Sequence, residues 1–138
     1  MLRDTTPNNV AKANLEKLFE ELQVPELVRE QWYEALISKD VKLNVHARIL
    51  AYFSETRQIR VRKQADYGLS WRKYGLDGVF FNIATKFARL ESLVWKRNAQ
   101  FVNDESVRDT FIDMLNYIFY SIFLLEEENF RGKDNHDA

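Results

Sequence analysis

Residues 105–125 read ESVRDTFIDMLNYIFYSIFLL, a run in which large apolar side chains recur at every third or fourth position. The recurring set is Phe111, Leu115, Ile118, Ile122 and Leu125. This spacing places all five on one face of an α-helix. Glu105 favours a helix start, because an acid in the first turn complements the helix dipole. We predict a helix from about 105 to 127, with this apolar set as its core stripe.

Apolar residues also recur at helical spacing in several segments before residue 105. Three of the four glycines fall between residues 66 and 78, and the whole chain has only two prolines, so few positions favour sharp turns. Asn8 or Asn9 can cap the first helix. The sequence therefore predicts an all-α fold, a single compact bundle of about five helices. The expected helices cover about 9–22, 25–38, 40–64, 79–97 and 105–127.

Composition excludes several classes of protein. Hydrophobic residues make up 46% of the chain, which is enough for a core and excludes wholesale disorder. The net charge of -1 gives no overall attraction to nucleic acid, so a nucleic-acid partner is not expected. Without cysteine there is no disulfide, thiolate metal site or thiol nucleophile. No signal-peptide pattern and no long apolar run occurs, so we expect a soluble, cytoplasmic protein without a membrane partner.

Polar residues occupy the other side of the 105–127 helix. Glu105, Asp109, Asp113 and Asn116 fall within an arc of roughly 80°, and Tyr120 continues it. Stacked carboxylates repel each other, and a hard cation such as Mg²⁺ relieves that repulsion. The alternative interpretation is an ordinary solvated helix face. Extension of the polar row into an apolar stretch favours a lined pocket.

The 79–97 helix carries a matching basic feature. Asn82, Lys86 and Arg89 fall within about 60° of each other, so the two cations could hold a phosphate. The alternative is ion pairing between this face and the acids of the last helix. Three aromatic residues near the glycines, Tyr67, Trp71 and Tyr74, could stack on a base or pack in the core. The sequence has no P-loop, dinucleotide-binding glycine motif, nucleophile elbow or zincin motif.

The order of these motifs resembles a known family. The motifs are Asp66-Tyr67-Gly68-x-Ser70-Trp71, Gly75-x-x-Gly78, Lys86-x-x-Arg89-Leu90, Asn103-Asp104-Glu105-Ser106 and Asp109-x-x-x-Asp113-x-x-Asn116-Tyr117. Together they resemble the nucleotide modification associated domain 1 family over residues 60–126. The pattern is also distantly similar to the MazG-like all-α nucleoside triphosphate pyrophosphohydrolases.

The resemblance implies an association with nucleotide metabolism. MazG-like enzymes bind Mg²⁺ through acids of two helices and release pyrophosphate from nucleoside triphosphates. Carried over to this sequence, Glu105, Asp109 and Asp113 would be the catalytic, metal-binding residues.

The same resemblance assigns the ligand contacts. Lys86 and Arg89 would contact phosphate, and Asn116 would support a ligand or a metal-bound water. The sequence departs from the MazG-like pattern on the earlier helix, where it offers these two cations and a single Glu91 in place of an E-E-x-x-E cluster.

Three functions are therefore compared. The first is Mg²⁺-dependent pyrophosphohydrolysis of a nucleoside triphosphate, with Asn82, Tyr67, Trp71 and Tyr120 as further ligand contacts. The second is a non-catalytic module that binds a nucleotide or an anionic signalling molecule. The third is a helical protein–protein adaptor. We expect a homo-oligomer built from an N-terminal helical, oligomerising extension (1–58), a family-like core (59–127) and a polar tail (128–138).

Overall fold

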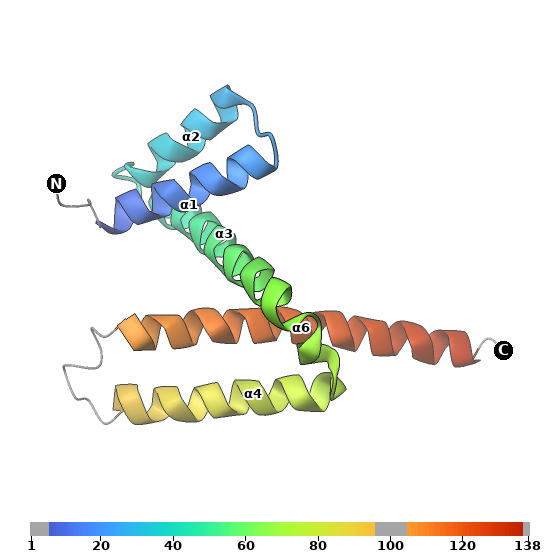
Figure 1. Cartoon of the computed structure of the whole chain (residues 1–138). Helices are drawn as coiled ribbons and strands as arrows, with labels where there is room; N and C mark the ends of the chain where they lie inside the picture. Colours follow the sequence, from blue (N-terminus) through green and yellow to red (C-terminus); the bar gives the residue numbers. More distant parts are fainter. Residues whose placement is uncertain (1–5, 96–104, 137–138) are drawn as a thin grey trace. The chain divides into compact units, whose positions relative to one another are not determined.

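The computed structural model describes the backbone of residues 6–95 and 105–136, and the side chains of residues 6–95 and 107–130 (Figure 1). Within these residues the chain forms α-helices, two short helical turns and no strands, which confirms the all-α class. The α-helices are α1 (Pro7–Glu21), α2 (Glu26–Leu36), α3 (Val41–Tyr67), α4 (Gly75–Leu90) and α6 (Glu105–His136). The short turns are η1 (Ser70–Arg72) and η2 (Glu91–Trp95).

The helices divide into two compact units. One unit ends at Val61 and the other begins at Arg62, so the boundary falls inside the continuous helix α3. None of the helices in the described part of the chain combines the length and the apolarity that crossing a bilayer requires.

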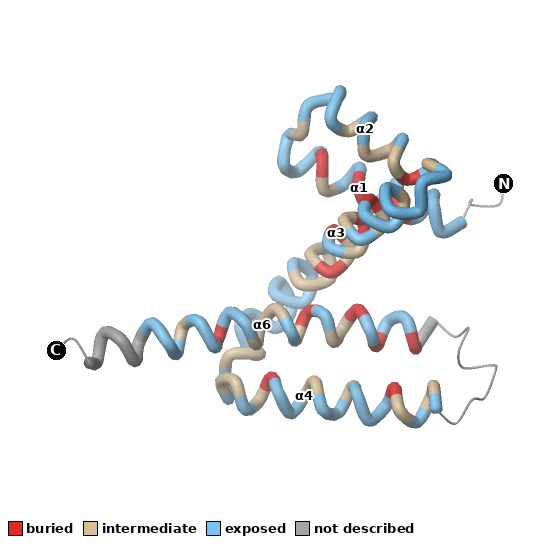
Figure 2. The backbone as a smooth tube through the Cα atoms, turned by 180° about the vertical axis from the view of Figure 1, so that it is seen from behind, coloured by how far each residue is buried: buried red, intermediate tan, exposed pale blue. Residues whose placement is uncertain are grey.

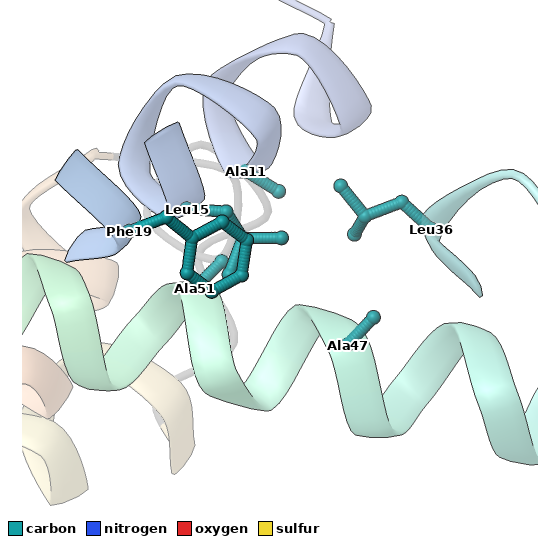
Figure 3. Close-up of a cluster of buried hydrophobic side chains, with 6 residues drawn as sticks. All are labelled: Ala11, Leu15, Phe19, Leu36, Ala47 and Ala51. Atoms are coloured by element: carbon teal, nitrogen blue, oxygen red, sulfur yellow. The ribbon is translucent and has the colours of Figure 1, made fainter. Parts of the chain in front are cut away.

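The N-terminal unit has a small apolar core contributed by α1, α2 and α3 (Figure 3). Its buried members are Ala11, Leu15, Phe19, Leu36, Ala47 and Ala51. The two alanines of α3 are fully buried, and their small side chains let the larger residues of α1 approach that helix closely. Burial of this core is what stabilises the unit.

The boundaries of several helices differ from the prediction. Thr6 caps α1 by accepting a hydrogen bond from the backbone N–H of Asn9 at 3.4 Å, so the predicted asparagine cap is wrong. Helix α4 begins at Gly75, four residues earlier than expected. Helix α6 continues to His136, well past the predicted end at 127. The predicted loop at 98–104 lies outside the described residues.

Glycine turns the chain where the sequence suggested. Gly68 follows α3 with φ +61°, and its N–H donates to the carbonyl of Gln64 at 2.8 Å. Gly75 opens α4 with φ +62°. Both values lie in the left-handed region that glycine tolerates best, so these positions end one helix and start the next.

In the C-terminal unit, α4 and α6 lie side by side and run in opposite directions (Figures 1 and 2). Buried residues on the two helices are Val79, Leu90, Val107, Thr110, Ile112, Asn116 and Leu124. The apolar set predicted as the core stripe of the last helix is not among them. Its five side chains are between 37% and 51% exposed, so that part of the prediction is wrong for the described chain. Helix α6 buries a different part of its circumference.

Candidate functional site

A cavity of about 470 Å³ lies in the C-terminal unit. It is formed by the end of α3, the glycine turn with η1, and the facing parts of α4 and α6. Its walls are Lys63, Gln64, Tyr67, Gly68, Ser70, Trp71, Tyr74, Asn82, Asp113, Asn116, Tyr117 and Tyr120. Aromatic rings, amides and a few charged groups therefore converge on one space, a composition typical of small-molecule sites.

The structure brings most of the predicted ligand contacts together. Tyr67, Trp71, Asn82, Asn116 and Tyr120, drawn from four separate elements, all line this cavity. Their roles as ligand contacts stay predictions, but their convergence is a finding.

The other predicted site residues lie in different places. Asp113 lines the cavity, and Lys86 reaches it through an ion pair with Asp113. Asp109 and Arg89 are exposed and outside the cavity wall. The side chain of Glu105 lies outside the described side chains, although its backbone begins α6.

Two aromatic rings form a stacked pair in the cavity wall. The rings of Trp71 and Tyr120 have centroids 4.2 Å apart and planes only 8° from parallel. Tyr117 approaches Tyr120 edge-on at 6.4 Å. One face of the Trp71 ring covers one face of the Tyr120 ring. A ligand could therefore stack only on the opposite face of either ring.

Two tyrosines make the outer part of the wall. Tyr67 and Tyr74 are 71% and 73% exposed, in contrast to the half-buried Trp71. A flat, aromatic ligand can therefore meet ring faces here without displacing the Trp71–Tyr120 pair.

Charge in the cavity centres on Asp113. Its Oδ1 lies 3.4 Å from Nζ of Lys63, and its Oδ2 lies 3.4 Å from Nζ of Lys86. The carboxylate is three-quarters buried, so these pairs are less screened than surface pairs. The contact with Lys86 is the ion pairing between helices that the sequence offered as an alternative to phosphate binding.

The two amides come from facing helices. Asn82 belongs to α4 and Asn116 to α6, and Asn116 is only 6% exposed. An amide offers both a carbonyl acceptor and N–H donors. This pair can therefore form hydrogen bonds with a ligand that carries both donors and acceptors along one edge.

An ion pair anchors the turn that carries Trp71. Nη2 of Arg72 lies 2.6 Å and 2.7 Å from the two carboxylate oxygens of Glu127. The same guanidinium lies over the rings of Trp71 and Phe123, with centroid distances of 5.9 and 5.6 Å. The contacts tie η1 to α6 and hold the indole in place.

Metal binding receives no direct support from the described side chains. No group of three or more His, Asp or Glu residues suited to a metal ion occurs among them. Both oxygens of Asp113 already face lysine ammonium groups. Since the side chain of Glu105 is not described, the Mg²⁺ triad stays a prediction.

Several cavity residues were missed from the sequence. No ligand role was predicted from the sequence for four residues of the wall, Lys63, Gln64, Ser70 and Tyr117. A signal for Lys63 existed, because it lies four residues before Tyr67 and so on the same face of α3.

Comparison of the sequence with known proteins gives a match to a family model, and it lies within the C-terminal unit. Neither a curated protein nor a solved structure matches the chain. The similarity to MazG-like enzymes stays a prediction. Every residue of the cavity wall lies between Lys63 and Tyr120. That range falls inside residues 63–125, which match the family described as nucleotide modification associated domain 1.

Proposed function

We propose that the unit beginning at Arg62 binds a nucleotide in this cavity. The observation that carries the proposal is the composition of the wall, in which aromatic rings, paired amides and two lysines around one carboxylate converge within the family match. Each of these groups suits a different part of a nucleotide. The volume of about 470 Å³ is in the range of small-molecule sites.

The base would lie among the aromatic side chains. Every nucleobase has a flat π-face, and stacking on an aromatic ring contributes about 1–3 kcal/mol per base. The exposed rings of Tyr67 and Tyr74 provide such faces. The amides of Asn82 and Asn116 would then hydrogen-bond the base edge, which combines donors and acceptors as they do.

The phosphate would lie near Lys63 and Lys86. These two cations face one carboxylate, that of Asp113, which leaves a surplus of one positive charge. This charge balance suits a nucleoside monophosphate better than a triphosphate, whose larger charge would need further cations or a metal ion. Arg89 lies one turn beyond Lys86 and would be reached only by a longer phosphate chain.

Mg²⁺-dependent pyrophosphohydrolysis is the second candidate. It is favoured by Asp109 and Asp113, which lie one turn apart on α6, with Asp113 in the cavity wall. With Glu105 they would hold an ion that polarises the phosphate and orients a water. Asp113 would first have to exchange its two lysine partners for the metal, and the lysines would then turn to the phosphates.

One experiment separates these candidates. The full chain is incubated with the common ribo- and deoxyribonucleoside 5′-monophosphates and triphosphates, in Mg²⁺ and in EDTA. Binding is followed by calorimetry, and every nucleotide is followed by chromatography with mass detection. Monophosphate binding in EDTA without turnover supports the binding module. Conversion of a triphosphate to its monophosphate and pyrophosphate only in Mg²⁺ establishes the enzyme. No binding and no turnover overturns both.

A further inference from the structure

Helix α6 exposes a continuous apolar stripe, which we call the α6 stripe. It consists of Phe111, Leu115, Ile118, Ile122 and Leu125, spaced four, three, four and three residues apart. All five side chains are exposed to between 37% and 51%. This is the 3.5-residue spacing with which helices pack against other helices in coiled coils and bundles.

The stripe is bordered by few charges. Between residues 110 and 125 the only charged residue is Asp113, which lies on the other side of α6, in the cavity wall. A helix that is apolar over most of its circumference is normally covered on all of those sides. Helix α4 covers another side of α6, so the α6 stripe offers a second packing face.

Charges at the two ends of the stripe indicate what covers it. Arg108 precedes the stripe and Glu126 follows it, and they lie about five helical turns apart. Because that is a whole number of turns, both lie along the same edge of the stripe, at opposite ends. The midpoint between them falls beside Ile118, the centre of the stripe.

This arrangement is complementary to itself under a two-fold rotation. When two identical helices pack antiparallel, each edge of one meets the same edge of the other with its ends exchanged. Arg108 of one copy then meets Glu126 of the second copy, and the reverse contact forms at the far end. In a parallel pair, Arg108 of one copy would instead lie at the same height as Arg108 of the other, and Glu126 at the same height as Glu126, so the opposite charges would not meet. An isologous pairing of this kind is the commonest way in which identical chains associate.

We infer that the α6 stripe is the interface with a second copy of this chain, packed antiparallel about Ile118. The interface goes beyond the nucleotide site, since it lies on a different side of α6 from Asp113 and the cavity. It also places self-association on the C-terminal unit, whereas the sequence suggested residues 1–58 for that role.

Sedimentation velocity of the full chain over a range of concentrations tests the inference. We expect a species of twice the 16.4 kDa chain mass. Ile122→Glu places a charge in the interface of both copies and is expected to weaken dimerisation at least tenfold. The matched control is Ile37→Glu, because Ile37 is 75% exposed in the N-terminal unit and should leave the dimer intact. A monomer at all concentrations, or equal effects of both variants, would overturn the inference.

Charge reversal tests the register without touching the apolar residues. Arg108→Glu and Glu126→Arg should each weaken the dimer several-fold, and the double variant should restore it. This set keeps the test decisive if Ile122→Glu lowers the far-ultraviolet circular dichroism of the chain. Failure of the double variant to recover would overturn the antiparallel register.

The absence of cysteine allows a direct test of orientation. Phe111→Cys and Leu125→Cys chains are treated with a short bismaleimide, separately and as a mixture. Antiparallel packing predicts cross-linked dimers in the mixture of the two variants and few in either alone. Efficient cross-linking of each variant with itself would instead show a parallel pair and contradict the inference.

Discussion

The indole of Trp71 lies parallel to the phenol ring of Tyr120, with ring centroids 4.2 Å apart, and so joins the glycine turn to α6 in the wall of the cavity. The two residues are far apart in the sequence, and each was singled out as a ligand contact. Their mutual stacking gives them a structural role whether or not a ligand is present, because it fixes the turn after α3 to the helix that forms the opposite wall.

Replacement of Trp71 should therefore affect both stability and binding. Trp71→Ala removes the stack on Tyr120 and the edge contact with Phe123, so we expect a loss of about 3 kcal/mol of unfolding free energy. Nucleotide affinity should fall about tenfold, and Trp71→Phe should recover most of both. Thermal unfolding and calorimetry measure the two effects. The matched control is Trp95→Ala, since Trp95 is 72% exposed and outside the cavity.

Asp113→Asn distinguishes a phosphate site from a metal site. The substitution keeps the shape of the side chain and removes the charge that holds Lys63 and Lys86. For a site that binds phosphate through these lysines, monophosphate affinity in EDTA should rise several-fold, since the carboxylate no longer competes. For a metal site, Mg²⁺-dependent turnover should be lost.

Asp109→Asn is the matched control for that substitution, because Asp109 is exposed one turn away on the same helix. It should leave metal-free binding unchanged. Weaker monophosphate binding by Asp113→Asn than by the unchanged chain would contradict the proposed phosphate position.

The sequence predicted the parts of the fold that depend on local pattern. Apolar periodicity gave the helices, and glycine marked the turn between α3 and α4. Helical spacing placed Asn116 and Tyr120 on the side of α6 that the structure puts in the cavity wall with Trp71. These inferences need only the geometry of one helix at a time.

The parts that failed depend on what lies against a helix. Periodicity identified the α6 stripe as apolar, but it could not show that α4 packs on another side of α6. Lys63 and Asp113 come together only because α3 and α6 meet, a contact between segments 50 residues apart. The helix was predicted to end near 127, yet α6 continues to His136, and Glu127 pairs with Arg72 of the distant turn η1, a contact that helical periodicity alone does not reveal.

A side chain at Gly78 is expected to clash with Tyr74. A Cβ built at this position would lie 2.7 Å from Cβ of Tyr74, an atom held rigidly by the backbone. Alanine in a helix interior normally stabilises by roughly 0.5–1 kcal/mol relative to glycine. Here Gly78→Ala should instead destabilise by about 1–3 kcal/mol, because the methyl group displaces Tyr74 from the cavity wall. Chemical denaturation measures the change, and Tyr74→Gly in the same chain should relieve it. An increase in stability would show that Tyr74 moves freely.

The core of the N-terminal unit can be weakened without reaching the cavity. Leu15 is fully buried among residues of α1, α2 and α3, so Leu15→Ala should cost about 2–5 kcal/mol through lost burial and the cavity left behind. Leu27→Ala is the control, because Leu27 is 71% exposed and its loss should cost well under 1 kcal/mol. The two variants are compared by chemical denaturation and by calorimetry below the unfolding transition. All residues of the proposed nucleotide site lie beyond Val61, so nucleotide affinity of the folded Leu15→Ala chain should equal that of the unchanged protein. A large loss of affinity in the folded variant would show that the N-terminal unit takes part in binding.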